Sequence, residues 1–378
     1  MRFIDNGDLV NKKILARVDF NVSLNDDGTI SNDERIKQTL PTLRYLLDNG
    51  NTLILMSHLG NPKQQDEKYS LGNVAKRLQT YLPDYTVILK NDLAPLGNTS
   101  QKTIVMLENL RFNPGEKAND TEFAKQLASL ADVYVNDAFS ASHRSHASIV
   151  GVPLYLPSYA GFLLKKEIEL IGSAIKNPRK PLVAILGGAK ISTKLKLIGR
   201  FIDIADHIIL AGGLAHNFFL AEGKQIGKSI SEPDEVEHTK TLFTKATQKH
   251  VDIALPTDVI IQTGETKRVG DITETDQIFD VGIESRIHFS NLIKEAKTII
   301  WNGPLGMFED AKFRGGTDAV YAAIISNPDA ISVAGGGDTL AAIAGKTGRE
   351  KITHISTGGG AMLEFIENGT LPGIEALK

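Results

Sequence analysis

Short runs of apolar residues, rich in β-branched side chains, recur along the whole chain. Polar residues do not alternate with the apolar ones inside these runs, so each run predicts a strand that is buried on both faces of a parallel sheet. Segments with helical periodicity separate most of the runs, and this alternation predicts an α/β fold with doubly wound sheets. The ten predicted strands are residues 12–18, 51–57, 103–107, 132–136, 181–186, 207–211, 251–254, 298–301, 331–334 and 353–356.

A connector in the middle of the chain divides these strands into two groups. Residues 176–181 hold two prolines and three basic residues, which suits an exposed link between domains, although an ordinary surface loop fits equally well. The preceding residues, 159–175, carry a broad apolar stripe at helical spacing. From the 378 residues and about 150 residues per domain, we expect two lobes, with four strands before the connector and six after it.

Composition and charge exclude several classes of protein. Hydrophobic residues make up 42% of the chain and charged residues 23%, as in ordinary globular proteins. The 42 Lys and Arg residues against 45 Asp and Glu residues leave a net charge of −3, which argues against nucleic acid as the main partner, although a local basic patch is compatible with it. The absence of cysteine excludes disulfides, zinc–thiolate sites, iron–sulfur clusters and a cysteine nucleophile.

The sequence carries no signal for export or membrane insertion. Asp5 and Asp8 lie where a signal peptide needs an apolar core, and no apolar run approaches the ~20 residues of a membrane span. We therefore expect a cytoplasmic protein that does not bind a membrane, either an enzyme or a binding protein.

Basic side chains follow the strands of the first half. Ligands bind outside the carboxyl ends of strands in open parallel sheets. Several arginines and histidines at one such edge would bind a small, multiply charged anion, because arginine offers paired donors to phosphate and carboxylate. Alternatively, each cation pairs with a local acid such as Asp19, Glu108 or Asp137. The cations are Arg17, Arg35, His58, Arg111, His143, Arg144 and His146.

Glycines follow the strands of the second half. Four of its six strand ends carry adjacent glycines, and the triple-glycine loops 335–337 and 358–360 each precede a helical segment. Glycine lets the backbone approach a ligand, and helix N-termini present free N–H groups to anions, so we expect a nucleotide or phosphate site. A tight strand–helix turn is the alternative reason for such glycines. The chain lacks a Walker A motif and His-Glu-x-x-His, and the absence of G-x-G-x-x-G argues against a standard dinucleotide site.

Three charged residues of the second half leave alternatives open. Asp338 could hold Mg²⁺ beside phosphates or, equally, cap a helix. Lys190 and Lys194 are four residues apart, so one helical face could direct both toward phosphates, with a solvated basic face as the alternative. An anion site on one lobe and a phosphate site on the other suggest phosphoryl transfer, which needs positioned donors and the exclusion of water by closing lobes.

The sequence resembles the phosphoglycerate kinase family along essentially the whole chain. The resemblance implies two Rossmann-like doubly wound parallel-sheet lobes joined by a helix and hinge. It also implies reversible phosphoryl transfer between 1,3-bisphosphoglycerate and MgADP, giving 3-phosphoglycerate and MgATP. The motifs, in the family's order, are ARVDFNV (16–22), ERIKQTLPTL (34–43), MSHLG (56–60), LENLRF (107–112), NDAFSASHRSHAS (136–148), LGGAK (186–190), WNGPLGMFE (301–309), AGGGDT (334–339), HISTGGGAMLEF (354–365) and LPGIEAL (371–377).

The resemblance further implies roles for individual residues. Arg35 is implied to lie nearest the transferring group, Lys190 to follow that group in flight, and Asp338 to hold Mg²⁺ as part of MgADP or MgATP. The implied catalytic residues are Arg35, Lys190, Gly358, Gly359 and Gly360. The implied phosphoglycerate ligands are Asp19, Asn21, Arg35, His58, Asn61, Arg111 and Arg144. The implied nucleotide ligands are Lys194, Gly212, Gly213, Leu214, Asn302, Glu309, Gly335, Gly336, Gly337, Asp338 and Thr339.

The family's domain organisation is carried over in the same way. It implies a phosphoglycerate-binding lobe of residues 1–158 with 365–378, an interdomain helix of residues 159–176, and a nucleotide-binding lobe of residues 177–364. It also implies a monomer. Two other classes compete with this interpretation. A dehydrogenase with two Rossmann-like lobes lacks its glycine fingerprint here, and a non-enzymatic two-lobed binding protein would not need Lys190 together with the Asp338 loop.

Three positions depart from the family's pattern. The arginine that usually follows SHLG is Asn61, a glycine has become Ser140, and a proline has become Ser23. Asn61 removes one cation from the expected phosphoglycerate site but can still form a hydrogen bond. We therefore expect a changed affinity for the substrate rather than a changed reaction.

Overall fold

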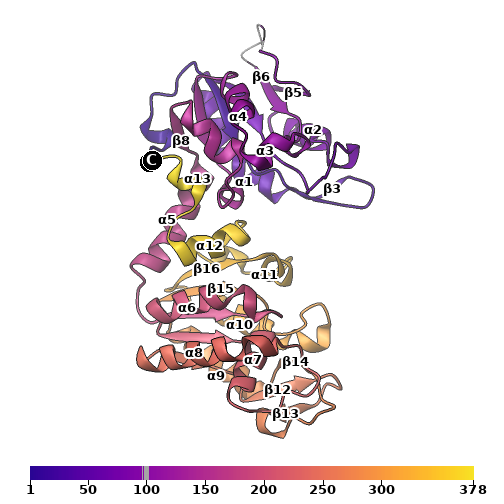
Figure 1. Ribbon diagram of the computed structural model, residues 1–378, viewed down its shortest axis with the longest axis vertical. Coiled ribbons are helices and arrows are strands. Elements are labelled where there is room, and N and C mark those ends of the chain that lie inside the picture. The colour runs from indigo at the N-terminus through magenta and orange to yellow at the C-terminus, as the bar shows by residue number, and fades with distance from the viewer. Residues whose placement is uncertain (96, 98–101) are drawn as a thin grey trace. The chain divides into compact units, whose positions relative to one another are not determined.

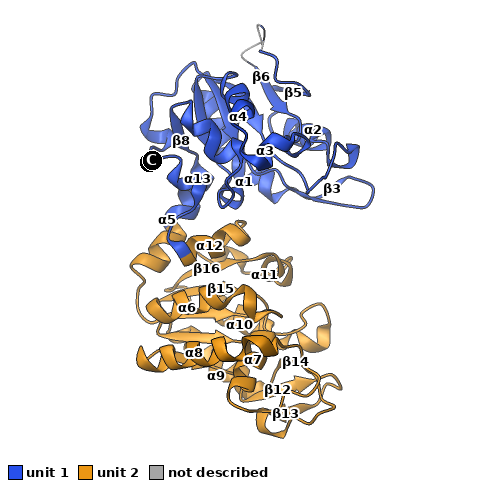
Figure 2. Cartoon of the chain, viewed as in Figure 1, with its two compact units in different colours: residues 1–169, 368–378 blue, residues 170–367 orange. Residues whose placement is uncertain are grey.

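The structure, a computed structural model, describes residues 1–95, 97 and 102–378. The chain folds as two units (Figure 2), with residues 1–169 and 368–378 in unit 1 and residues 170–367 in unit 2. The division falls within helix α5 (Phe162–Lys176), inside the segment where the sequence predicts a helix. Among the described residues, no helix is both long enough and apolar enough to cross a membrane.

Six parallel strands form the sheet of unit 1 (Figure 1), in the order β5-β6-β4-β1-β7-β8. Strands β4, β5 and β6 lie on one side of β1, whereas β7 and β8, which come later in the chain, lie on its other side. The strand order therefore reverses between β1 and β7, which makes this position a topological switch point. The strands are β1 (Lys13–Arg17), β4 (Thr52–Met56), β5 (Thr86–Lys90), β6 (Thr103–Leu107), β7 (Val133–Asn136) and β8 (Ser158–Ala160). A separate antiparallel ribbon consists of β2 (Ser23–Leu24) and β3 (Ile30–Asn32).

The C-terminal segment returns to unit 1. Its short helix α13 packs against residues 142–151, where the Gly373 amide donates a hydrogen bond to the Ser142 carbonyl at 2.8 Å. A Cβ on Gly373 would lie 2.7 Å from the Ile149 side chain, so only glycine fits there without displacement. The helices of unit 1 besides α5 are α1 (Glu34–Asp48), α2 (Gly72–Tyr81), α3 (Pro114–Ala118), α4 (Thr121–Ala128) and α13 (Pro372–Glu375).

Unit 2 has a second six-stranded parallel sheet, in the order β11-β10-β9-β15-β16-β17. This is the Rossmann order 3-2-1-4-5-6, with its switch point between β9 and β15. The strands are β9 (Leu182–Leu186), β10 (His207–Leu210), β11 (Asp252–Ala254), β15 (Thr298–Asn302), β16 (Ile331–Gly335) and β17 (His354–Ser356). The helices are α6 (Leu195–Ile204), α7 (Gly213–Ala221), α8 (Val236–Gln248), α9 (Ile283–Glu295), α10 (Gly315–Ile325), α11 (Gly337–Ala342) and α12 (Gly360–Asn368).

Both large sheets are buried on both faces. Ile14, Leu15 and Ala16 of β1 are all fully buried, although successive residues of a strand point to opposite faces. All five residues of β9 and all five of β15 are also buried. This double burial explains why the strands appear in the sequence as uninterrupted apolar runs.

All ten predicted strands are confirmed within one residue at either end, but the expectation of four strands before the connector is wrong. The sheet of unit 1 gains β5 and β8, which lie at its two edges. Edge strands bury less surface: β5 is exposed or half-buried along its length, and β8 has only three residues. The sequence also missed a three-stranded antiparallel sheet in unit 2, formed by β12 (Asp258–Ile261), β13 (Thr266–Arg268) and β14 (Ile278–Val281).

Asp258 joins this small sheet to helix α9. Its buried carboxylate accepts hydrogen bonds from the backbone amides of Glu284 and Ser285, at 3.0 and 2.8 Å, in the first turn of α9. Burial alone would raise the pKa of Asp258, but the hydrogen bonds from Ser285 and Glu284 outweigh it and hold the pKa below its usual value. The charged carboxylate therefore adds stability above the unfolded-state pKa, and this contribution is lost as the pH falls through the lower pKa of the folded state.

We expect Asp258→Ala to lower the free energy of unfolding by about 1–3 kcal/mol at pH 7, because buried amides lose their acceptor. Chemical denaturation measures this, and the difference from wild type should shrink in acid. As a control, Asp203→Ala removes a part-exposed ion pair with Lys245 and should cost less than about 1 kcal/mol. Equal costs for the two variants would contradict the role given to Asp258.

Candidate functional site

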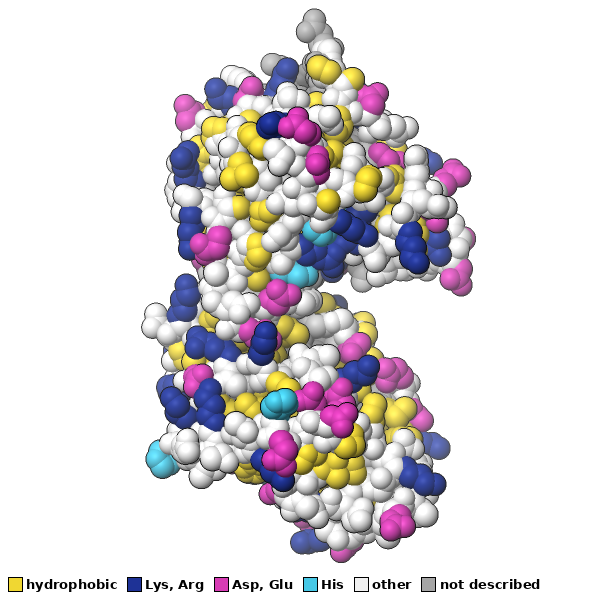
Figure 3. All heavy atoms as spheres, viewed as in Figure 1, with side chains coloured by type: hydrophobic (Ala, Val, Ile, Leu, Met, Phe, Trp, Pro, Cys, Tyr) yellow, Lys and Arg dark blue, Asp and Glu magenta, His cyan; other side chains and the backbone are white. Residues whose placement is uncertain are grey.

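Basic residues of unit 1 lie at or after the carboxyl ends of strands β1, β4, β6 and β7. Figure 3 shows Lys and Arg side chains gathered with histidines on this unit. Arg17, His58 and Arg111 are 1%, 5% and 8% exposed, so they are almost completely removed from water. Buried cations need either partners within the fold or a bound anion.

A buried chain of hydrogen bonds orients His58. The Ser148 hydroxyl donates to Glu116 at 2.7 Å and accepts from Arg17 Nε at 2.9 Å. Arg17 Nη2 lies 3.0 Å from His58 Nδ1, and because a guanidinium can only donate, the hydrogen of the neutral ring sits on Nε2. Burial, followed by the charges of Arg17 and Arg144, lowers the pKa of His58 well below its usual value. His58 is therefore a neutral ring with one free donor.

Arg35 is paired with an acid of its own unit. Its guanidinium forms an ion pair with the Asp19 carboxylate, and the Ser140 hydroxyl donates to the same carboxylate. Burial lowers the pKa of Arg35, and the charge of Glu167 opposes this effect. The interpretation in which each cation pairs with a local acid therefore applies to Arg35, and Ser140, one of the unusual positions, takes part in the pair.

Two further donor atoms of unit 1 belong to Arg111 and His143. Arg111 Nε and His143 Nδ1 are buried without a hydrogen-bond partner among the described residues. Arg144 Nε donates to His143 Nε2 at 3.2 Å, so the unpartnered Nδ1 carries the hydrogen. Arg111 donates to the Gly60 carbonyl, and the Gly60 amide donates to Asn21 Oδ1 at 2.8 Å. Buried polar atoms without partners are rare, so these donors indicate the place of an anionic ligand.

Asn61 has a cation beside it. Lys117 of α3 donates to Asn61 Oδ1 at 2.7 Å. Burial and neighbouring cations lower the pKa of His146 to about 4, and Lys117 is one of these cations. The Lys117 ammonium therefore lies near the histidines of the cluster, where it can supply the positive charge that Asn61 lacks.

Loops of unit 2 touch at the carboxyl ends of its strands. A Cβ on Gly187 would lie 1.8 Å from the Pro304 carbonyl oxygen, and a Cβ on Gly213 would lie 2.0 Å from the Ala189 oxygen. Gly212 has φ of +64°, a left-handed conformation that other residues rarely adopt. The glycines here are thus required by close backbone packing, whatever ligand the loops bind.

Lys194 and Asn302 tie the loops after β9, β15 and β16 together. Lys194 donates to Asn302 Oδ1, and Asn302 Nδ2 donates to the Gly335 carbonyl at 2.7 Å. Thr339 Oγ1 accepts from the Gly303 amide at 2.7 Å. Burial lowers the pKa of Lys194 to about 8, and the charge of Asp338 opposes this shift.

The positions of the helix ends decide between the alternatives that the sequence left open for Asp338 and for the pair Lys190 and Lys194. Gly336, and not Asp338, is the residue before α11, and Asp338 is exposed in its first turn, so the interpretation of Asp338 as a helix cap is wrong. Lys190 and Lys194 flank a single turn of 3₁₀ helix, and α6 begins only after Lys194. The two lysines therefore do not share the face of one helix. Lys190 is exposed, whereas Lys194 is half-buried.

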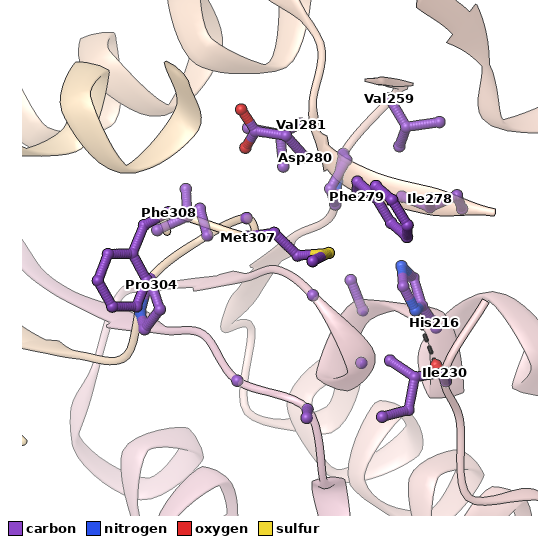
Figure 4. A pocket seen from close by; sticks show the side chains of 18 of the residues that line it. His216, Ile230, Val259, Ile278, Phe279, Asp280, Val281, Pro304, Met307 and Phe308 are labelled. Carbon is purple, nitrogen blue, oxygen red and sulfur yellow. Dashed lines mark hydrogen bonds between the residues drawn. The ribbon is translucent and has the colours of Figure 1, made fainter. Parts of the chain in front are cut away.

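A pocket of about 340 Å³ lies among these elements of unit 2 (Figure 4). It brings together some residues predicted for a nucleotide, namely Gly212, Gly213, Glu309 and Asp338. Leu214, predicted for the same site, is fully buried and is not part of the lining. The lining also contains side chains that the sequence did not suggest, among them His216, Phe219, Ile230, Val259, Ile278, Phe279 and Met307. Several belong to the small sheet whose strands were not predicted, so sequence reasoning had no signal for them.

The second triple-glycine loop leads into α12. Gly359 has φ of +55°, and a Cβ on Gly359 or Gly360 would meet no atom within 4 Å. The space around these amides is therefore open to a ligand. The Gly358 amide, by contrast, donates to the Ser356 hydroxyl at 3.1 Å.

The residues around Asp338 fit a Mg²⁺ ion that arrives with phosphates. Asp338 is exposed and lines the pocket, and no group of three or more His, Cys, Asp or Glu side chains that could hold a metal occurs in the described part of the chain. Mg²⁺ is commonly bound by one or two carboxylates together with substrate phosphates. One carboxylate beside a pocket matches that arrangement better than a resident metal site.

The sequence is similar to phosphoglycerate kinases over its whole length. The family model described as phosphoglycerate kinase matches residues 4–369. The phosphoglycerate kinase of Coprothermobacter proteolyticus is 44% identical over 390 residues, covering 100% of this chain and 98% of that protein. The phosphoglycerate kinase of Prosthecochloris aestuarii is 46% identical over 385 residues, covering 97% of this chain and 96% of that protein.

Solved structures give the same result. The structure of phosphoglycerate kinase from Coxiella burnetii superposes with a TM-score of 0.91 at 39% identity, covering 99% of this chain and 97% of that one. The crystal structure of phosphoglycerate kinase from Pyrococcus horikoshii superposes with a TM-score of 0.85 at 32% identity, covering 100% of this chain and 98% of that one. The chain thus shares both sequence and fold with these proteins.

The lowered pKa of Lys194 implies that the affinity for the nucleotide depends on pH. We expect the affinity for ADP to fall between pH 7.5 and 9.5, by at most about tenfold per pH unit above about 8, as Lys194 loses its charge. Isothermal titration calorimetry measures this dependence. Lys194→Arg, which keeps its charge, should flatten the profile, and an unchanged slope in that variant would exclude Lys194 as its source.

Proposed function

Because the chain belongs to the phosphoglycerate kinase family, we propose that its two groups of site residues hold the two substrates of that family's reaction. The protein is a phosphotransferase with a carboxyl acceptor, which transfers phosphoryl reversibly between 1,3-bisphosphoglycerate and ADP, giving 3-phosphoglycerate and ATP. The observation that carries the proposal is the set of buried, unpartnered donors in unit 1. A coupled assay with ATP, Mg²⁺ and 3-phosphoglycerate, following ADP release, tests the reaction, and an inactive protein would overturn it.

The phosphoglycerate side of the reaction is assigned to unit 1. Arg111, His143 and Arg144 would bind the phosphate and carboxylate groups, and His58 would donate from Nε2. Asn21 and Asp19 would act mainly by positioning, since Asn21 holds the Gly60 amide and Asp19 holds Arg35.

The nucleotide side is assigned to unit 2. The pocket would receive the base and ribose, with Glu309 as an acceptor for ribose hydroxyls. Lys194, Asn302, Thr339 and the loop 335–337 would hold the phosphates. Leu214 would support the base from behind the lining, because it is buried in α7. Asp338 would hold Mg²⁺, which screens the negative charge of the nucleotide phosphates when bound.

The transfer itself needs stabilisation of a moving phosphoryl group. Its oxygens would receive hydrogen bonds from Arg35 and from the amides of Gly359 and Gly360, while Lys190 would neutralise charge as the group moves. Gly358, the third predicted glycine, would act through the shape of the loop, because its amide already donates to Ser356. The exposed position of Lys190 and the open space around Gly359 and Gly360 support these roles. The ion pair with Asp19 would keep Arg35 oriented toward the substrate.

Closure of the two lobes is a further part of the proposal. The expected boundaries are a lobe of residues 1–158 with 365–378, a helix of residues 159–176 and a lobe of residues 177–364. The separation of the two groups of site residues into unit 1 and unit 2 supports a closing motion, because the substrates can react only if both groups meet them. We also propose that the protein works as a cytoplasmic monomer without nucleic acid, in line with its near-neutral charge balance.

If the two lobes close over the substrates, the radius of gyration of the protein should depend on which ligands are bound. Small-angle scattering should give a smaller radius of gyration with ADP and 3-phosphoglycerate together than with either one, because only the closed state contacts both. Equal radii in all ligand states would remove closure from the mechanism.

We expect Arg35→Ala to lower kcat by roughly 10²–10⁴, because charge on the transferring group loses its nearest donor. Steady-state assays measure this effect, and thermal melting controls for folding. Arg77→Ala removes an exposed arginine that pairs with Asp33 in the same unit, and it should leave kcat unchanged. A near wild-type kcat for Arg35→Ala would show that this arginine does not act on the transferring group.

Lys117 should replace the missing cation at Asn61. We expect Lys117→Ala to raise KM for 3-phosphoglycerate by about 10- to 150-fold with little change in KM for ATP, the scale of one charge-assisted hydrogen bond. Asn61→Arg in that background should restore KM. Lys125→Ala, which removes an exposed lysine of α4 paired with Glu122, is the control and should change neither constant. An unchanged KM in Lys117→Ala would show that other groups complete the site.

A further inference from the structure

His216 is a polar side chain in the apolar part of the pocket of unit 2. It comes from α7, is 2% exposed and lines the pocket together with Ile230, Phe279 and other apolar residues. One ring nitrogen, Nδ1, lies 2.8 Å from the Ile230 carbonyl oxygen. Figure 4 shows this contact and shows the other nitrogen of the ring on the side of Phe279.

The contact with Ile230 decides which nitrogen carries the hydrogen. A carbonyl oxygen can only accept, so His216 Nδ1 must donate to it. Burial lowers the pKa of His216 to about 4, so the ring is neutral at pH 7 and Nε2 has no hydrogen. Nε2 is therefore an acceptor of fixed direction, and no hydrogen bond to it is recorded among the described residues.

The other polar side chains of this region differ from His216. The Asp280 carboxylate already accepts from the Gly316 amide at 3.0 Å and from Arg286 at 2.9 Å. Gln277 has an amide that can present either its oxygen or its nitrogen after rotation, so it accepts or donates as a ligand requires. His216, by contrast, presents one uncharged acceptor atom whose direction is fixed by the contact of the same ring with Ile230.

We propose that His216 Nε2 accepts a hydrogen bond from an exocyclic amino group of the nucleotide base and so selects a 6-amino purine over a 6-oxo purine. This rests on the proposed function, which places the nucleotide in this pocket. In a 6-oxo purine bound in the same orientation, an oxygen lone pair would face the lone pair of Nε2. The buried acceptor would then have neither a ligand donor nor water.

The proposal predicts discrimination between ADP and IDP, whose bases differ in the substituent at position 6 and in the N1 hydrogen that accompanies the oxo group. Wild-type protein should bind ADP about 5- to 30-fold more tightly than IDP in calorimetric titrations of the full chain, the effect of one unpaired buried acceptor. His216→Phe keeps a ring but removes the acceptor, and its ratio of ADP to IDP affinity should fall to about 1. His216→Gln keeps an acceptor oxygen and should retain part of the discrimination.

The ratio of ADP affinity to IDP affinity distinguishes a contact between His216 and the base from a purely structural role of His216. Loss of the hydrogen bond to Ile230 in His216→Phe can weaken both nucleotides equally, but only loss of a base contact changes their ratio. Thermal melting without ligand reports whether the variants fold. If His216→Phe does not fold, the ¹⁵N resonance of Nε2 in wild-type protein gives an independent measurement: it should shift toward the hydrogen-bonded range with ADP and not with IDP.

The possible outcomes are distinct. If wild-type protein does not bind ADP at all, the proposed nucleotide site fails. If ADP binds normally but IDP binds equally well in the wild type and the Nε2 resonance does not respond, the proposed function stands and the role of His216 is overturned. A preference for ADP that persists unchanged in His216→Phe also overturns that role.

Discussion

A parallel sheet that is buried on both faces can meet a small ligand only along an edge where its strands end. Both large sheets of this chain are subject to that constraint, since successive residues of β1 and whole strands such as β9 and β15 are buried. The loops at the carboxyl ends therefore carry nearly all the chemistry. Most candidate residues of unit 1 lie at or after the ends of β1, β4, β6 and β7, and those of unit 2 lie at or after the ends of β9, β10, β15, β16 and β17.

The same constraint explains what the sequence could and could not predict. Strands buried on both faces leave long apolar runs, so their positions were found within one residue. The edge strands β5 and β8 are exposed or half-buried for most of their length, and the strands of the small antiparallel sheet have only three or four residues each, so neither matches the pattern of a long strand buried on both faces. Site residues that follow buried strands could be named from sequence for the same reason, whereas pocket side chains such as Ile278 and Phe279, in β14, could not.

Contacts between side chains that are remote in the chain could not be predicted from the sequence. The order of Glu116, Ser148, Arg17 and His58 in one buried chain depends on packing between segments more than 30 residues apart. The partner of Asn61 is also remote, because Lys117 lies 56 positions along the chain. Asp338 had two equal interpretations until the backbone placed Gly336 at the start of α11. In each case the residue type limited the chemistry, and three-dimensional packing chose among the remaining possibilities.

The path of the chain through the two units bears on the order in which they are completed. Unit 2 is one continuous stretch, residues 170–367, whereas unit 1 needs residues 368–378 as well. The last segment buries Leu371, Ile374 and Leu377 and packs against the loop that carries Ser142. Because residues 368–378 follow all of unit 2 along the chain, every residue of unit 2 is synthesised before unit 1 is complete, even though domains that begin first usually fold first. A chain cut short by a dozen residues would lose this support of the anion site while retaining every residue of the nucleotide pocket.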